Sequence, residues 1–145
     1  MATASPGCYY ELGQATTTSG MAHVSEHEAG IVREVFARVR NRDPAVADLY
    51  HEDATLSEGG GHVHKGRDAI RAFYQGVFSG RGPQPRVRGL WNNGSIYAAL
   101  LEVTFAAGGV THAVDVFDVD SDGIRSMRVC RGGLEEGSAP LAASE

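Results

Sequence analysis

The sequence has few features that would direct the protein to a membrane, to nucleic acid or to the secretory pathway. No apolar run approaches the roughly 20 residues that cross a bilayer, and no basic, apolar and small-residue leader stands at the N-terminus. The two cysteines, Cys8 and Cys130, form no disulfide framework, which favours a reducing compartment. The net charge of −5 indicates neither a nucleic-acid partner nor an anionic membrane. We therefore expect a cytoplasmic protein.

The length and composition predict a single domain with a tail at each end. The 145 residues, 42% of them hydrophobic, are enough to bury a core. Residues 1–24 and 133–145 are rich in small residues and show no periodicity, which predicts a flexible arm and a flexible tail around a domain at 25–132. Arg81, Arg86 and Arg88 cluster without an aromatic ladder between them, and we interpret them as the solvated start of a strand.

The first half of the domain predicts three helices. Ser25 and Glu28 form a capping box at the start of the first helix, and Asp43-Pro44 opens a short second one. A third follows Gly66 and ends at Ser79-Gly80. Apolar residues recur at helical spacing in the first and third helices: Val32, Val35, Phe36 and Val39, then Ile70, Phe73, Tyr74, Val77 and Phe78.

The remaining pattern predicts strands. A short strand at 54–58 is followed by three glycines and by His62-Val63-His64 as a possible hairpin partner. Period-two alternation then predicts strands at 86–92, 95–105, 110–120 and 123–131, with Asn-Gly and Asp-Gly turns between two of the pairs. Three helices followed by an antiparallel meander predict an α+β domain whose curved sheet closes over the helices. Such a cone would enclose a concave, mostly apolar pocket.

Three stretches resemble the ketosteroid-isomerase-like, or SnoaL-like, branch of the NTF2-like superfamily. They are residues 48–55 (DLYHEDAT), 65–74 (KGRDAIRAFY) and 113–119 (AVDVFDV), and the resemblance extends over about 26–131. It implies an NTF2-like cone: three N-terminal helices packed on a strongly curved, mainly antiparallel sheet. It also implies a small apolar ligand, a homodimer and no cofactor.

The resemblance also assigns candidate site residues. The family's general base corresponds to Glu58, and its neutral carboxylic acid corresponds to Asp118. Two supporting tyrosines correspond to Tyr50 and Tyr74. The sequence departs from the family in four places. The tyrosine of the first helix is absent near Val35 or Phe36, and the base Glu58 is a glutamate rather than an aspartate. Gly59 replaces a proline, and Arg131 stands where a tryptophan is common.

The alternation of side chains along the strand predicts which residues share a face with Asp118. Asp118 shares one strand face with His112 and Val116, whereas Asp115 lies on the other face with Phe117. If the Asp118 face lines the pocket, an apolar setting would keep Asp118 protonated and able to donate a hydrogen bond. Asp115 would then be an outward charge.

Other polar and aromatic residues are candidates for binding rather than catalysis. His62 and His64 would rim the mouth of the pocket, and His112, Trp91 and Arg131 are further substrate-binding candidates. A His-x-His pair is a weak metal signal, so we expect no metal. The run from Asp118 to Gly123 imitates a calcium loop, but its twelfth position is Val129 where a glutamate is required.

Three functions remain open. The first is a cofactor-independent isomerase or cyclase that moves a proton on an apolar carbonyl or polyketide-like molecule, with Glu58 as base and Asp118 as acid. The second is an epoxide hydrolase or epoxide-opening cyclase, which a pocket-facing Arg131 would favour. The third is a non-catalytic binding module or dimeric scaffold, for which the missing first-helix tyrosine argues.

Overall fold

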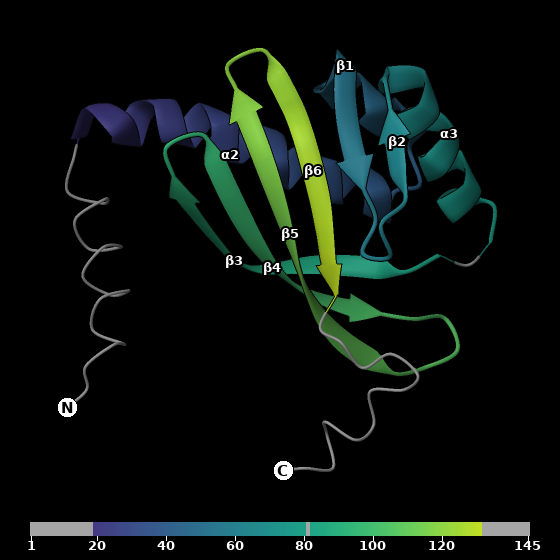
Figure 1. The fold of residues 1–145 in the computed structure, drawn as a ribbon. Helices are drawn as coiled ribbons and strands as arrows, with labels where there is room; N and C mark the ends of the chain where they lie inside the picture. The colour runs from purple at the N-terminus through teal and green to yellow at the C-terminus, as the bar shows by residue number, and fades with distance from the viewer. Residues whose placement is uncertain (1–18, 81, 132–145) are drawn as a thin grey trace.

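The computed structural model describes residues 19–80 and 82–131, with the backbone alone for residues 19–25 and 131 (Figure 1). The tail expected at 133–145 and residues 1–18 of the expected arm lie outside this range. The elements, in chain order, are α2 (Ser19–Arg40), the 3₁₀ helix η1 (Pro44–Leu49), β1 (Tyr50–Ser57), β2 (Val63–Lys65), α3 (Arg67–Phe78), β3 (Gln84–Asn93), β4 (Ile96–Thr104), β5 (Val110–Asp120) and β6 (Gly123–Arg131). Within the described chain, no helix is both long and apolar enough to span a bilayer.

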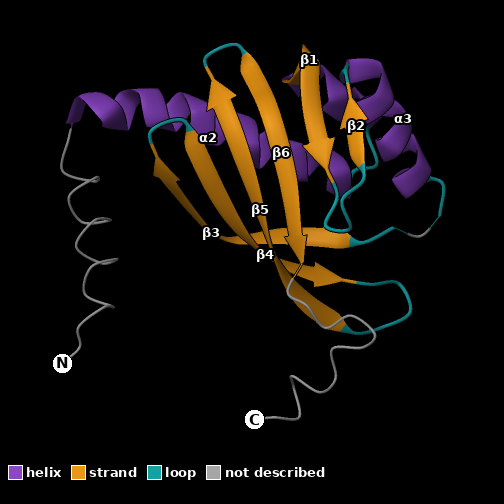
Figure 2. Ribbon diagram, in the orientation of Figure 1, coloured by secondary structure: helices purple, strands orange, loops and turns teal. Residues whose placement is uncertain are grey.

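The six strands form one curved sheet in the order β2-β1-β6-β5-β4-β3 (Figure 2). Every neighbouring pair is antiparallel except β1 and β6, which run parallel. Helix α2 packs against β3, β5 and β6, and α3 packs against β1 and β2. The helices therefore cover the concave side of an unclosed sheet, which confirms the predicted NTF2-like α+β fold.

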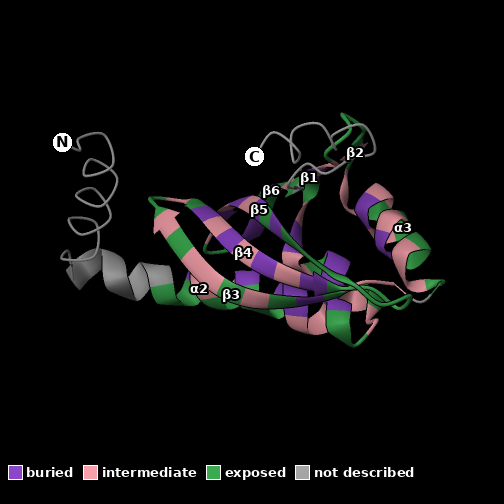
Figure 3. Ribbon diagram, turned by 90° about the horizontal axis from the view of Figure 1, so that it is seen from below, coloured by how far each residue is buried: buried purple, intermediate pink, exposed green. Residues whose placement is uncertain are grey.

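The core lies between the helices and the concave face of the sheet. Buried and more exposed positions alternate along β4 and β5, as period-two strands require (Figure 3). Phe117 on β5 is fully buried, and its ring meets that of Phe36 from α2 edge to face, with the centroids 5.8 Å apart. Burying one such side chain contributes about 1.5–3 kcal/mol. The alternation thus fixes which face of each strand looks inward.

The first helix begins earlier than the sequence predicted. It starts at Ser19, so Ser25 lies within the helix and does not cap it, and residues 19–24 of the expected arm are helical. The predicted capping box is therefore wrong. Glu28 instead lies buried and accepts a hydrogen bond from the Tyr97 hydroxyl at 3.2 Å, which ties α2 to β4.

A helix cap at Asp43 and a glycine turn at Gly123 position the neighbouring strands. Asp43 caps η1 by accepting a hydrogen bond from the amide of Ala45 at 2.9 Å, as predicted. β1 then begins at once, at Tyr50, four residues before the predicted start. Between β5 and β6, Gly123 has φ +144°, and a β-carbon there would come within 2.7 Å of the Leu49 carbonyl oxygen. Only glycine fits this approach of the β5–β6 turn to η1.

Candidate functional site

Two carboxyl groups occupy one row of the concave face. Asp115 on β5 pairs directly with Val129 on β6. Ser57 at the end of β1 pairs with Arg128, so the next residue, Glu58, follows beside Val129. Glu58 and Asp115 are thus two strands apart, and their backbones are separated by about 10 Å at the usual strand spacing. The two acidic residues thus flank Val129 of β6 on the concave face.

Asp115 is the inward-facing acid of β5, contrary to the sequence prediction. It is only 5% exposed, and it shares its face with the buried Ala113, Phe117 and Val119. The two faces were grouped correctly from the sequence, but the wrong face was assigned to the interior. The signal was present in the sequence: Phe117 is the bulkiest apolar residue of the strand, and it lies on the face of Asp115.

Asp118 lies on the outer face and is held as a carboxylate. Its Oδ1 accepts hydrogen bonds from Arg125 at 2.7 Å and from the Ser95 hydroxyl at 2.8 Å. The Arg125 hydrogen bond, supported by that of Ser95, lowers the pKa of Asp118 below its ordinary value. The expectation that Asp118 stays protonated in an apolar pocket is therefore wrong, because the pairing with arginine favours the charged form.

A hydroxyl pair lies between α3 and the sheet. The hydroxyl groups of Tyr50, from β1, and Tyr74, from α3, are 2.7 Å apart. The sulfur of Met127 is 3.1 Å from the Tyr50 hydroxyl and 3.7 Å from that of Tyr74. Both tyrosines are buried, as the sequence led us to expect for residues whose hydroxyls need a partner. The partner is the other tyrosine rather than a carboxyl group in direct contact.

The electrostatics of this pair link it to Asp115. Burial is the main cause that raises the pKa of Tyr50 well above its ordinary value, with contributions from Tyr74 and Asp115. Burial likewise raises the pKa of Tyr74, and Asp115 lies close enough to raise it further when its carboxyl group is ionised. Both phenols therefore remain neutral across the physiological range, and each can donate a hydrogen bond.

Glu58 and His64 form a second pair at the end of β1. The Glu58 carboxylate is 2.7 Å from Nε2 of His64, which lies opposite Leu56 in the β1–β2 hairpin. The His64 ring contacts that of Phe73 from α3, with centroids 4.8 Å apart. The side chains of Glu58 and His64 are 33% and 17% exposed. This half-buried pair can accept a proton and share it between two groups.

The same hairpin offers one set of metal-ligand atoms. One ligand atom from each of Glu58, His62 and His64 lies within 4.8 Å of the others. These residue types suit Zn²⁺ and related divalent ions, and three protein ligands would leave a coordination position open. His62 is exposed and stacks edge to face on His64, at a centroid distance of 4.5 Å.

Two of the remaining predicted binding residues, Trp91 and His112, do not reach this site. Trp91 is 46% exposed, and its partner Ala98 places it on the outer face of the sheet, where the exposed His112 also lies. The prediction that Trp91 and His112 line the pocket is wrong, because the concave face takes the alternate positions of β3 and β5. Arg131 ends β6, and its side chain lies outside the described residues.

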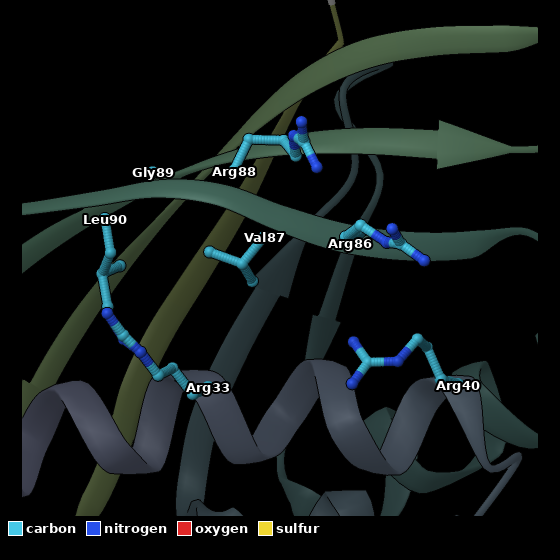
Figure 4. A pocket seen from close by; sticks show the side chains of 7 residues that line it. All are labelled: Arg33, Arg40, Arg86, Val87, Arg88, Gly89 and Leu90. Carbon is cyan, nitrogen blue, oxygen red and sulfur yellow. The ribbon is translucent and has the colours of Figure 1, made fainter.

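Two of the clefts on the described surface are lined mainly by charged residues, and neither is the apolar cone pocket that the sequence predicted. One, of about 570 Å³, is lined by His51, Glu52, Asp53, Arg67 and Asp122. It lies beside the His51–Asp120 pair, whose 2.9 Å hydrogen bond lowers the pKa of Asp120. The other, of about 520 Å³, lies between α2 and β3 and is lined mainly by arginines (Figure 4). Side chains such as Tyr50, Tyr74 and Met127 occupy the interior of the cone.

Comparisons with known proteins agree with this architecture. The model of the SnoaL-like domain family matches residues 32–127. One similar structure is SalBIII, an epoxide hydrolase/cyclase-like enzyme with a role in pyran ring formation in the polyether salinomycin. It is 28% identical to this chain. The alignment covers 72% of this chain and 89% of that one, with a TM-score of 0.63. An NTF2-like protein of unknown function from Mesorhizobium loti is 20% identical over 75% of this chain and 93% of that one, with a TM-score of 0.67.

A designed protein shares this shape, so the shape alone does not identify the function. A de novo designed protein with a curved β-sheet is 15% identical over 82% of this chain and 96% of that one, with a TM-score of 0.66. No functionally curated protein matches the sequence. The chemistry must therefore be argued from the side chains of the concave face.

Proposed function

This chain belongs to the SnoaL-like domain family, and from that premise we propose that it is a cofactor-independent acid–base enzyme acting on a small apolar molecule. The reaction class is isomerisation or cyclisation by proton transfer next to a carbonyl group. The observation that carries the proposal is the pair of carboxyl groups, Glu58 and Asp115, that share one row of the concave face across Val129.

Glu58 is the general base. Its carboxylate abstracts a proton from the carbon next to the carbonyl, and His64, hydrogen-bonded to it at 2.7 Å, stabilises the group that receives the proton. Phe73 limits the rotation of the His64 ring by packing against it. A base that is one-third exposed can still be reached by a ligand from the mouth of the cone.

Asp115 is the acid, in the role that the sequence had given to Asp118. A carboxyl group buried among apolar side chains is favoured in its neutral form, and a neutral carboxyl can donate a hydrogen bond to the oxyanion that forms as the proton leaves. Tyr50 and Tyr74, neutral and buried near Asp115, are positioned to support it. The two acids thus differ in role because they differ in surroundings.

The test is proton exchange in D₂O on a panel of small ketones and β,γ-unsaturated ketones, followed by ¹H NMR. We expect catalysed exchange, and Glu58→Gln and Asp115→Asn should each reduce its rate by about 10²–10⁴-fold. Asp118→Asn is the matched control, because it makes the same substitution on the outer face of the same strand, and it should change the rate by less than about threefold. Equal losses in Asp115→Asn and Asp118→Asn would contradict the assignment. Absence of exchange with every ketone would refute the carbonyl reaction.

Epoxide opening is the second candidate, and the likeness to the epoxide hydrolase/cyclase-like enzyme SalBIII favours it. In that reaction Asp115 would protonate the epoxide oxygen, while Glu58 would activate water or an internal hydroxyl group. The same variants decide between the reactions when they are assayed on epoxy alcohols. Ring closure or hydrolysis without ketone exchange would establish epoxide opening, and failure in both assays would leave a binding role for the cone.

A further inference from the structure

A second feature of the molecule is a groove lined by arginines at the edge of the sheet opposite to β1 and β2. It lies between α2 and β3, the strand at the far edge of the sheet, and has a volume of about 520 Å³ (Figure 4). Arg33 and Arg40 lie seven residues apart on α2, which places them on the same side of the helix, about 10 Å apart along its axis. Arg86 and Arg88 come from β3.

Among the residues that the structure describes, these arginines form no ion pair with a carboxylate. In the described residues Arg33, Arg86 and Arg88 form no ion pair, and Arg40 donates only to the carbonyl oxygen of Pro85, at 3.2 Å. By contrast, the neighbouring Arg38 pairs with Glu34 at 2.8 Å. The chain has a net charge of −5, yet no acidic residue of the described ranges 19–80 and 82–131 lines this groove. Like charges side by side destabilise the folded protein unless an anion offsets them.

The local backbone favours this clustering. The register between β3 and β4 shifts between Val87 and Gly89, so Arg88 is the extra residue of a β-bulge. Bulges re-aim a side chain relative to the regular alternation of the strand. Val87 and Leu90 pack partly against the core and give the groove an apolar floor. Figure 4 shows Arg33 and Arg40 rising from the helix toward the strand that carries Arg86 and Arg88.

We propose that this groove binds a diphosphate group carried by a small organic molecule. A guanidinium group presents a planar fork of donors that matches phosphate oxygens in a bidentate manner. A diphosphate carries about three negative charges, which suits four arginines better than the single charge of a carboxylate. The groove has the size of ordinary small-molecule sites, which span about 300–1,000 Å³. A polynucleotide suits it less, because the net charge of the whole chain would repel it.

The experiment is isothermal titration calorimetry of the full chain at low salt with pyrophosphate and, separately, with inorganic phosphate. We expect pyrophosphate to bind more tightly than phosphate, with an affinity that falls as KCl is added. The double variant Arg86→Gln/Arg88→Gln and the single variant Arg33→Gln should each raise the Kd for pyrophosphate at least tenfold. Arg128→Gln is the matched control, because it removes the same charge from an exposed position on β6, and it should leave the Kd unchanged.

Two organic probes then identify the source of the diphosphate. A nucleoside diphosphate and an isoprenoid diphosphate are titrated in parallel, and the one that binds more tightly than pyrophosphate identifies the organic part that the groove accepts. The proposal is overturned if no diphosphate binds, if Arg128→Gln weakens binding as much as the groove variants do, or if a single-stranded oligonucleotide displaces pyrophosphate at lower concentration. Circular dichroism of each variant establishes that a loss of binding is not a loss of fold.

Discussion

The hydroxyl pair of Tyr50 and Tyr74 allows a quantitative test of the buried network. Replacing Tyr50 by phenylalanine keeps the ring and removes one hydroxyl. The Tyr74 hydroxyl then loses its partner at 2.7 Å and retains only the Met127 sulfur, a weak acceptor at 3.7 Å. Because Tyr74 is 4% exposed, water cannot readily replace the lost partner. A buried polar group left in this way costs about 1–3 kcal/mol.

The reverse substitution should cost less. In Tyr74→Phe the Tyr50 hydroxyl keeps the Met127 sulfur at 3.1 Å as an acceptor. We therefore expect a loss of about 0.5–1.5 kcal/mol. In the double variant no hydroxyl is left without a partner, so its cost should fall below the sum of the two single costs by about 1 kcal/mol.

Urea denaturation of the wild type, the two single variants and the double variant at pH 7 measures these free energies of unfolding. The account requires that Tyr50→Phe be the more destabilising single change and that the two changes be non-additive. Strict additivity, or a larger loss for Tyr74→Phe, would refute the reasoning, because it would mean that the two hydroxyls do not depend on each other.

Three further predictions concern the surface, the assembly and the reaction. The pKa of Asp118 is lower in the folded protein than its unfolded value near 3.8, so its pairing with Arg125 stabilises the protein fully above that unfolded pKa and loses this effect as the pH falls through the folded pKa. Urea midpoints between pH 7 and 3 should therefore drop less in Asp118→Asn than in the wild type. An equal drop would contradict the pairing. We expect a homodimer formed through the outer face of the sheet, where Trp91 and Val114 are exposed. Multi-angle light scattering should show a dimer that Val114→Arg converts to a monomer. A monomeric wild type would disprove the interface. The proposed proton transfer needs no metal, so exchange activity should persist after dialysis against EDTA; a loss that Zn²⁺ restores would instead assign Glu58, His62 and His64 to a metal site.

Much of the fold could be predicted from local patterns in the sequence. The switch from helical to period-two spacing located α3 and the four strands β3–β6 to within a few residues, because both signals arise within one element. The start of α2 was missed because a capping box is a short motif, whose side chains can take other partners: Glu28 bonds Tyr97 on a distant strand instead.

The site was less accessible to sequence reasoning because it depends on non-local pairing. The parallel contact of β1 with β6 brings Glu58 beside Val129, and no local pattern indicates that register. Alternation separated Asp115 from Asp118 correctly but did not say which face looks inward. The packing of Phe117 against Phe36 from α2 settles that question in favour of Asp115. The sequence showed Arg86 and Arg88 as a cluster, but it did not indicate that they lie near Arg33 and Arg40, because α2 and β3 are some fifty residues apart in the chain.

The central claim is that Asp115, and not Asp118, is the neutral acid of the site, and carboxyl ¹³C NMR of the labelled protein at pH 6 tests it most directly. The account predicts the chemical shift of a protonated carboxyl group for Asp115 and that of a carboxylate for Asp118, with Asp115→Asn and Asp118→Asn used to assign the two signals. A carboxylate shift for Asp115 at this pH would contradict the account.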